Sequence, residues 1–249
     1  MQNTFREKAV IITGASSGIG FDQNISMVVR IRVVVRAIFS IGLMFAIVFI
    51  SAGRWDYWNG WVFCFLHVYG VLFNYIIIPS ELVQERFKPG DGTKKWDYIF
   101  HALFLPLIYI IPLIAALDGG RYYWTDGFSF WVIILAFFVV FIGYSLEILS
   151  LWKNRFFSIT VRIQKDRGHY VIDKGPYAFI RHPGYAGIII SHFGIAIGLN
   201  SLWALIPVGL FTSLFIIRTF LEDTTLIREL PGYTDYAAKV KYRLFPGIW

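Results

Sequence analysis

The hydrophobic pattern of the chain consists of long apolar runs separated by short polar segments. Most of the runs approach the ~20 residues that a helix needs to cross the hydrocarbon core of a bilayer. We therefore predict an all-α fold, a polytopic membrane helix bundle of about six spans. The predicted spans are residues 33–52, 57–79, 98–117, 128–151, 185–199 and 202–221.

The fifth apolar run is too short to cross a bilayer upright, so we expect it to be tilted or to form half of a tight hairpin. Only Asn200 and Ser201 separate it from the sixth run, which favours the hairpin. The pattern thus divides the chain into an N-terminal segment 1–26, a four-span region 27–151, and a region 152–249 that holds the hairpin and a polar tail.

The basic residues are distributed unevenly between the two ends of the predicted spans. Of the 23 Lys and Arg residues, only Arg54 and Arg121 fall in the loops after the first and third spans. Because basic residues accumulate on the cytoplasmic side, we expect both termini and the loop 152–184 to be cytoplasmic. Within that loop, the alternating residues 161–164 predict a short strand.

Composition supports a membrane protein and excludes several other classes. The chain is 57% hydrophobic and 16% charged, whereas soluble domains carry about 25% charge. The single cysteine, Cys64, excludes an intrachain disulfide and a cysteine-cluster metal site, and we expect no metal. The net charge of +7 accompanies apolar spans, so it favours anionic lipid headgroups rather than nucleic acid as partners.

Residues 9–20, with the sequence AVIITGASSGIG, resemble the glycine-rich opening of the short-chain dehydrogenase/reductase family. Such a turn holds a pyrophosphate on backbone N–H groups at a helix N-terminus. No βαβ unit follows here, and the pair Tyr170 and Lys174 has no sheet to position it. We interpret residues 1–26 as a non-functional remnant or a misassigned start, with Met27 as an alternative initiator.

Polar residues inside the predicted spans are a second class of candidates. We expect His67, Asn74 and His101 to form hydrogen bonds between helices. Glu147 has two interpretations, because an ionisable group in a span faces either a basic partner or a functional cavity.

The main candidate for chemistry is the stretch 169–187, with the sequence HYVIDKGPYAFIRHPGYAG, where Gly, Pro, Arg, His and Tyr gather between apolar runs. Proline interrupts regular hydrogen bonding and restrains the residue before it. Irregular backbone at membrane depth is tolerated where it lines a cavity. We therefore predict that this stretch forms the wall of a cofactor site at the membrane surface.

A second cluster lies where the sixth span leaves the membrane. Arg218 and Glu222 are four residues apart and share one helix face, with Asp223 beside them. Together with Arg181 and His182 they could form a clamp for a zwitterionic amino-acid group. An internal Arg218–Glu222 ion pair without any ligand is the alternative interpretation.

The stretch H-x-V-I-x-x-G-P-Y-x-x-x-R-H-P-x-Y-x-G resembles the signature of the isoprenylcysteine carboxyl methyltransferase family, whose form related membrane phospholipid N-methyltransferases share. The later Arg218-x-x-x-Glu222-Asp223, followed by Gly232, Tyr233 and Tyr236, resembles the second motif of that family. The acidic pair there is usually Glu-Glu, so Asp223 is a departure. The resemblance is specific over residues 150–249.

The resemblance implies that the C-terminal region binds S-adenosylmethionine at the cytoplasmic edge without a Rossmann domain. It assigns transfer-site roles to Arg181, His182, Tyr185 and Glu222. The implied cofactor-binding residues are His169, Tyr170, Val171, Gly175, Pro176, Tyr177, Arg181, His182, Tyr185, Arg218, Glu222 and Asp223.

The predicted function is therefore methyl transfer from S-adenosylmethionine to a lipidic or prenylated acceptor from the bilayer. Carboxyl O-methylation of an isoprenylcysteine-like acceptor is favoured, with phospholipid N-methylation as the alternative. Two rivals are a membrane reductase similar to the sterol reductases, which would bind NADPH, and a non-catalytic scaffold or transporter. The sequence leaves the oligomeric state open.

Overall fold

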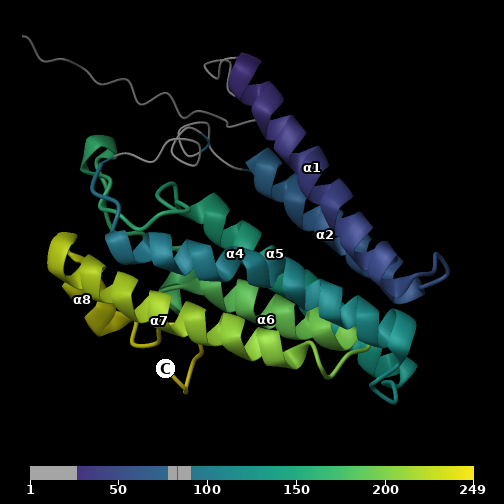
Figure 1. Ribbon diagram of the computed structural model, residues 1–249. Helices are drawn as coiled ribbons and strands as arrows, with labels where there is room; N and C mark the ends of the chain where they lie inside the picture. Colours follow the sequence, from purple (N-terminus) through teal and green to yellow (C-terminus); the bar gives the residue numbers. More distant parts are fainter. Residues whose placement is uncertain (1–26, 78–82, 84–90) are drawn as a thin grey trace, which may run out of the picture.

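The computed structural model describes residues 27–77, 83 and 91–249, and these form a bundle of helices (Figure 1). Five helices of the described chain are long and apolar enough to cross a membrane. This confirms the predicted polytopic helical bundle. The five are α1 (Met27–Ala52), α2 (Trp58–Ile77), α4 (Lys95–Ala116), α5 (Phe130–Lys153) and α7 (Leu205–Glu229). The dehydrogenase-like residues 1–26 lie outside the described chain.

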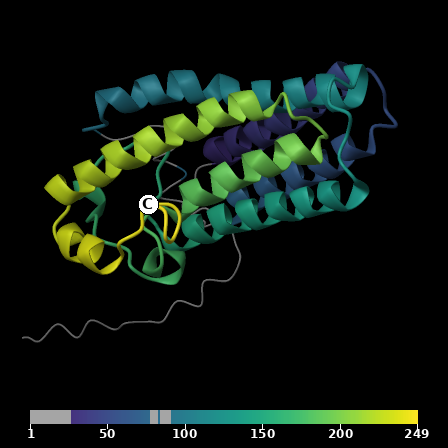
Figure 2. The same cartoon turned by 90° about the horizontal axis from the view of Figure 1, so that it is seen from below.

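The remaining helical elements of the described chain are shorter. The fifth predicted span is α6 (Pro183–Gly198), which is shorter than the others and pairs with α7 through a turn at residues 199–204, as the hairpin prediction requires (Figure 2). The others are the π-helical turn η1 (Leu117–Tyr122), the 3₁₀ turns η2 (Lys165–Arg167) and η3 (Gly175–Ala178), and α8 (Tyr233–Lys239).

Helices α5 and α6 approach so closely that their backbones touch. A Cβ atom added at Gly187 would lie 2.5 Å from the Gly143 carbonyl oxygen, and one added at Gly143 would lie 2.6 Å from the Gly187 carbonyl oxygen. Gly194 meets the Ala136 carbonyl oxygen in the same way, at 2.7 Å. Small residues permit such contact, which adds van der Waals packing where lipid offers no hydrophobic driving force.

Buried polar groups tie together the loops at one end of the bundle. The Asp118 carboxylate accepts hydrogen bonds from the backbone N–H of Thr125 at 2.8 Å and the hydroxyl of Ser201 at 2.6 Å. The Tyr57 hydroxyl donates to the Leu199 carbonyl oxygen at 2.5 Å. The loops after α1, α4 and α6 therefore share one end, and the Lys- and Arg-rich segments lie at the other.

At that basic end, the C-terminal tail fastens the turn that precedes α6. The backbone N–H groups of Arg181 and His182 donate to the carbonyl oxygens of Tyr242 and Arg243, at 3.0 and 2.9 Å. Pro183 then begins α6 at a position where the missing N–H costs no helical hydrogen bond. The kinked motif is thus held by the last residues of the chain.

Three local predictions were wrong in detail. Residues 161–164 form no strand, because the Val161 N–H donates to the Asp97 carboxylate at 2.8 Å instead of to a neighbouring strand. Asn74 and His101 bond to carbonyl oxygens four residues back in their own helices, and only His67 reaches another helix, at Ser40. The nearest acceptor on a helix is its own preceding turn, which explains the first two.

Candidate functional site

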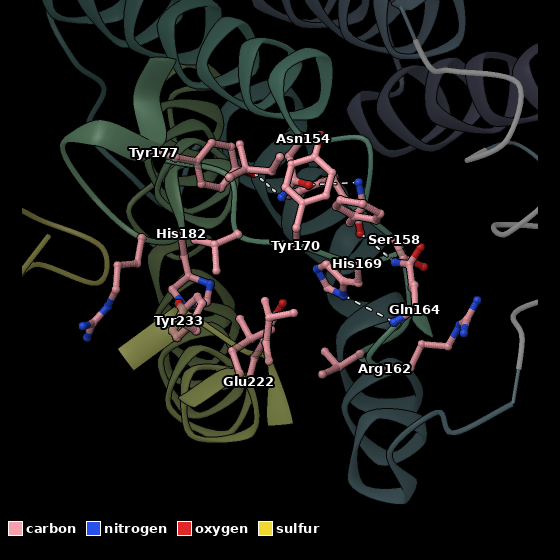
Figure 3. Close-up of a pocket in the computed structure, with 18 of the residues that line it drawn as sticks. Asn154, Ser158, Arg162, Gln164, His169, Tyr170, Tyr177, His182, Glu222 and Tyr233 are labelled. Atoms are coloured by element: carbon pink, nitrogen blue, oxygen red, sulfur yellow. Dashed lines mark hydrogen bonds between the residues drawn. The ribbon is translucent and has the colours of Figure 1, made fainter. Parts of the chain in front are cut away.

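A cavity opens at the basic end of the bundle, between the loop after α5 and the helices α7 and α8 (Figure 3). It holds about 740 Å³ of space, including its open mouth. The stretch 169–185 forms one wall and α7 the opposite wall. Its polar lining residues are Asn154, Ser158, Thr160, Arg162, Gln164, His169, Tyr170, Tyr177, Arg181, His182, Tyr185, Glu222, Tyr233 and Tyr236.

Most of the predicted site residues meet in this cavity. His169, Tyr170, Val171, Tyr177, Arg181, His182, Tyr185 and Glu222 all line it. Gly175, Pro176, Arg218 and Asp223 lie outside its lining. Gly175 begins the η3 turn with a φ of +63°, a left-handed conformation that glycine adopts without strain. The turn places the Tyr177 side chain in the wall.

Glu222 is a half-buried carboxylate in the cavity wall. Its Oε2 accepts a hydrogen bond from the Tyr185 hydroxyl at 2.6 Å. Among the described residues, Glu222 forms no ion pair with a Lys, Arg or His side chain. Within the described part of the chain, Glu222 is therefore a cavity-lining carboxylate without a Lys, Arg or His partner.

The adjacent Asp223 is fully buried and satisfied by the protein itself. Arg181 and Arg243 approach its Oδ2 at 3.0 and 2.9 Å, and the Tyr233 hydroxyl donates to Oδ1 at 2.8 Å. His182 lies 3.4 Å from the same Oδ1. Asp223 thus connects α7 to the stretch 169–187, to α8 and to the C-terminal tail. Although Asp is shorter than the Glu that is usual at this position of the motif, its carboxylate reaches partners within the protein.

Arg218 turns away from the cavity, towards α4. Its Nε lies 3.2 Å from Oδ1 of the buried Asp97, and its NH2 donates to the Ile159 carbonyl oxygen at 2.5 Å. The guanidinium lies over the Tyr185 ring, 5.3 Å from its centroid. The alternative Arg218–Glu222 ion pair is therefore not formed. Arg218 instead supports the wall in which Tyr185 stands.

His169 is held as a neutral ring. The backbone N–H of Gln164 donates to its Nδ1 at 3.3 Å, so the single N–H of the neutral imidazole is on Nε2. Burial, followed by the nearby Arg167 and Arg162, lowers the pKa of His169 to about 4. The ring packs against Phe156, with 4.4 Å between centroids. His169 therefore offers one donor and an aromatic face on this side of the cavity.

Two buried tyrosines fix the opposite rim. The Tyr236 hydroxyl donates to the Tyr177 carbonyl oxygen at 2.7 Å, and Asn154 donates to the Tyr177 hydroxyl at 3.2 Å. Burial raises the pKa of both phenols, so they remain protonated donors. These hydrogen bonds join η3 to α8 and to the end of α5 at this side of the cavity.

Two polar atoms beside the cavity are buried without a hydrogen-bond partner in the described chain. These are Nε of Arg181 and Oγ1 of Thr160. A buried polar atom left unsatisfied is costly, so such atoms point to a missing ligand or water. Both residues line the cavity.

Sequence reasoning missed Asn154, Thr160 and Gln164 in the lining, and Asp97 behind it. The polar loop residues carry no pattern that separates them from an ordinary surface loop. Asp97 did carry a signal, since it is an acidic residue at the start of an apolar run and, like Glu147, required a partner.

Comparison with known proteins identifies the region that builds this cavity. Residues 131–230 match the phospholipid methyltransferase family. The chain is also 23% identical over 149 residues to Protein-S-isoprenylcysteine O-methyltransferase B of Arabidopsis thaliana, covering 57% of this chain and 71% of the relative. Both matches agree with the resemblance carried by the two motifs. The chain is thus a polytopic helical membrane protein whose C-terminal part is similar to the phospholipid methyltransferase family and to an isoprenylcysteine methyltransferase.

Proposed function

We propose that the cavity binds S-adenosylmethionine and that the protein transfers its methyl group to an amphipathic acceptor that enters from the bilayer. Carboxyl O-methylation of an isoprenylcysteine-like acceptor is the favoured reaction. The family supports methyl transfer as the reaction class, and the cavity supports the site.

The observation that carries the proposal is the contrast between Glu222 and Asp223. Asp223 has its charge compensated by Arg181 and Arg243, whereas Glu222 lines the cavity and, among the described residues, accepts a hydrogen bond from the Tyr185 hydroxyl without an ion pair. A carboxylate in that state attracts an ammonium group, such as that of a methionine moiety. The unsatisfied Arg181 Nε supplies a donor for the carboxylate of the same moiety.

The remaining lining also fits this ligand. Phe156, Tyr170 and His169 supply aromatic faces for an adenine ring, and the His169 Nε2–H supplies a donor. Tyr177 and Tyr185 lie on the other side, where aromatic faces favour a positively charged sulfonium. We assign these residues, together with Val171 and His182, to cofactor binding. Gly175, Pro176, Arg218 and Asp223 are proposed to shape the wall.

When bound, S-adenosylmethionine supplies a methyl group that is already activated by the sulfonium. The protein residues then need only to hold the acceptor in line and to exclude water, and orientation alone can lower a barrier by ~7–11 kcal/mol. Tyr185 on α6 and Glu222 on α7 are the cavity-lining residues that we expect to meet an acceptor arriving along these helices. A carboxylate acceptor is already deprotonated and needs no base.

Phospholipid N-methylation is the second candidate, and the phospholipid methyltransferase match favours it. An amine acceptor has to lose a proton, so this reaction needs a base beside the cavity. We propose His182 as that base, because it lines the cavity and stacks beside Tyr185 with 5.6 Å between centroids. Identification of the methylated product distinguishes the two reactions.

The direct test is transfer of a labelled methyl group from S-adenosylmethionine into membrane extracts by the purified protein. We expect a labelled lipidic product with the wild type and none with Glu222→Ala or Arg181→Ala, although both variants insert into membranes. A reductase would instead bind NADPH and not S-adenosylmethionine. A scaffold would retain its function in both variants. A dehydrogenase at the N-terminus would lose activity on deletion of residues 1–26, whereas we expect this deletion to leave activity intact.

A further inference from the structure

One wall of the cavity at the basic end is formed by residues 158–162, which we call the wall segment. The residues of this segment that line the cavity are Ser158, Thr160, Val161 and Arg162. Arg162 and Glu222 lie on opposite sides of the cavity (Figure 3). The wall segment belongs to no helix or strand. Its backbone therefore needs hydrogen-bond partners from elsewhere in the chain to keep one conformation.

Partners of the wall segment come from α4 and α7. The backbone N–H of Val161 donates to Oδ2 of Asp97 at 2.8 Å, and the Val161 carbonyl oxygen accepts from the backbone N–H of Lys94 at 3.0 Å. The guanidinium of Arg218 donates to the Ile159 carbonyl oxygen at 2.5 Å. The segment is thus tied to two helices that are distant from it in the sequence.

Asp97 is a fully buried carboxylate in the first turn of α4. An acidic residue in that turn stabilises a helix when it faces the N–H groups at the N-terminus. Asp97 makes two further contacts that this local role does not require. Its Oδ2 accepts from Val161, and its Oδ1 lies 3.2 Å from Nε of Arg218. One carboxylate therefore joins α4 to the wall segment and to α7.

Arg218 carries the connection from Asp97 to the other side of the cavity. Its guanidinium lies 4.4 Å from the centroid of the Phe100 ring and 5.3 Å from that of the Tyr185 ring. The Tyr185 hydroxyl in turn donates to Oε2 of Glu222 at 2.6 Å. The Asp97–Arg218 pair thus contacts both the wall segment and the residue that holds Glu222.

A buried ion pair is by itself weak evidence for stability, because apolar residues of similar volume can often replace it without loss. We propose that Asp97 is a positioning residue of the cavity, which together with Arg218 holds the wall segment in place and so slows the release of a bound ligand. A wall that opens more often lets its ligand escape more often. The inference rests on the proposed function for the identity of that ligand, S-adenosylmethionine.

Hydrogen exchange of the ligand-free, full-length protein in lipid nanodiscs tests the first half of the inference. The double variant Asp97→Ala with Arg218→Met removes both charges together, so that neither is left buried without a counter-charge. We expect peptides that cover residues 156–164 to exchange about tenfold faster or more, as the loss of a hydrogen bond to a charged group gives. Asp97→Asn, which keeps a neutral acceptor, is the second variant and should show a smaller increase.

The rate of ligand release tests the second half. Each protein is loaded with labelled S-adenosylmethionine, and its release is followed after addition of an excess of unlabelled S-adenosylmethionine. We expect release from the double variant to be about tenfold faster than from the wild type. A merely structural role of Asp97 would lower the fraction of sites that bind, but it would not change the rate of release from the sites that remain.

Asp118→Asn is the matched control. Asp118 is also fully buried and also accepts a hydrogen bond from a backbone N–H, that of Thr125 at 2.8 Å, but it lies at the opposite end of the bundle. The control should lower the temperature of thermal unfolding, as Asp97→Asn does. It should leave the exchange of residues 156–164 and the rate of ligand release as in the wild type.

Unchanged exchange of residues 156–164 or an unchanged release rate in a folded Asp97 variant would overturn the inference, and so would an equal acceleration in Asp118→Asn. The wild type is decisive if neither Asp97 variant folds, because fast exchange of its Val161 amide would show that the wall segment is not held. If the wild type binds no S-adenosylmethionine, the proposed function fails, and the exchange of the ligand-free protein then decides whether Asp97 holds the wall segment.

Discussion

Two adjacent carboxylates on α7 have opposite surroundings, and this contrast defines the site at the scale of single residues. Glu222 is directed into the cavity beside Tyr185, whereas Asp223 is buried between Arg181, Arg243 and Tyr233. In the sequence motif the two residues form one acidic pair. The structure separates a residue that lines the cavity from a buried residue that holds the wall together.

The first prediction uses that contrast. Glu222→Gln should weaken binding of S-adenosylmethionine by at least about tenfold, because the charge-assisted hydrogen bond to the ammonium group of the ligand is lost. The same change should leave the free energy of unfolding almost unchanged. Asp223→Asn should lower the free energy of unfolding by about 3–5 kcal/mol, because Arg181 and Arg243 lose a buried counter-charge. Calorimetric titration and chemical unfolding in detergent measure the two effects. Loss of stability in Glu222→Gln, or loss of binding without loss of stability in Asp223→Asn, would contradict the assignment.

The second prediction concerns His169 and pH. Its pKa in the folded protein is about 4, below the ordinary value of 6.5, so between these pH values the unfolded chain binds more protons. The stability that the neutral ring contributes is therefore complete above pH 6.5 and is lost as the pH falls towards 4. The loss for this one group should be about 1–3 kcal/mol.

The measurement compares wild type with His169→Gln, which cannot titrate. Unfolding free energies of the two proteins are determined at pH 7 and pH 5, and their difference removes the contribution of other groups. We expect the wild type to lose more stability than the variant on acidification. An equal loss in both proteins would show that His169 does not titrate in this window.

At the scale of secondary-structure elements, the close approach of α5 and α6 sets the position of the motif. Gly187 belongs to the motif itself, and its α-carbon faces the Gly143 carbonyl oxygen. Because α6 begins at Pro183, any separation of the two helices would move Tyr185 and His182 relative to α7. The glycines are therefore needed for geometry, and the cavity depends on helix packing.

The third prediction tests that packing. Gly143→Ala places a methyl group 2.6 Å from a backbone oxygen, so it should lower the free energy of unfolding by about 1–3 kcal/mol and weaken cofactor binding. Gly209→Ala on α7 is the matched control, since nothing lies within 4 Å of its Cβ position. It should be neutral or slightly stabilising. Thermal unfolding with and without S-adenosylmethionine distinguishes the two; identical effects would contradict the close-packing argument.

The helices could be predicted from the sequence because a long apolar run is a local signal. The last span was predicted to end at residue 221, yet α7 continues to Glu229 and carries Arg218, Glu222 and Asp223 on one uninterrupted helix. The contact between Arg218 and Asp97 could not be predicted. Asp97 is 121 residues from Arg218, and no periodicity links positions so far apart.

At the scale of the whole molecule, the chain is divided into a basic end with the cavity and an opposite end closed by Asp118, Tyr57 and their partners. The uneven distribution of Lys and Arg favours a cytoplasmic location for the basic end. S-adenosylmethionine is a charged, water-soluble molecule, so a cavity that opens to the cytosol is consistent with the proposed function.

The fourth prediction tests this orientation. In a Cys64→Ser background, Asp173→Cys should be labelled by a membrane-impermeant thiol reagent from the cytoplasmic side, and Asp126→Cys from the opposite side, because they lie at opposite ends of the bundle. Labelling is compared in intact cells and inverted vesicles. Accessibility of both positions from one side would contradict the proposed topology.

The central claim is that this cavity binds S-adenosylmethionine through Glu222. Isothermal titration of the purified protein with S-adenosylmethionine and with NADPH, repeated with Glu222→Gln, tests it most directly. The account predicts saturable binding of S-adenosylmethionine by the wild type, at least about tenfold weaker binding by the variant, and no binding of NADPH. Binding of NADPH alone, or equal affinity for S-adenosylmethionine in both proteins, would contradict it.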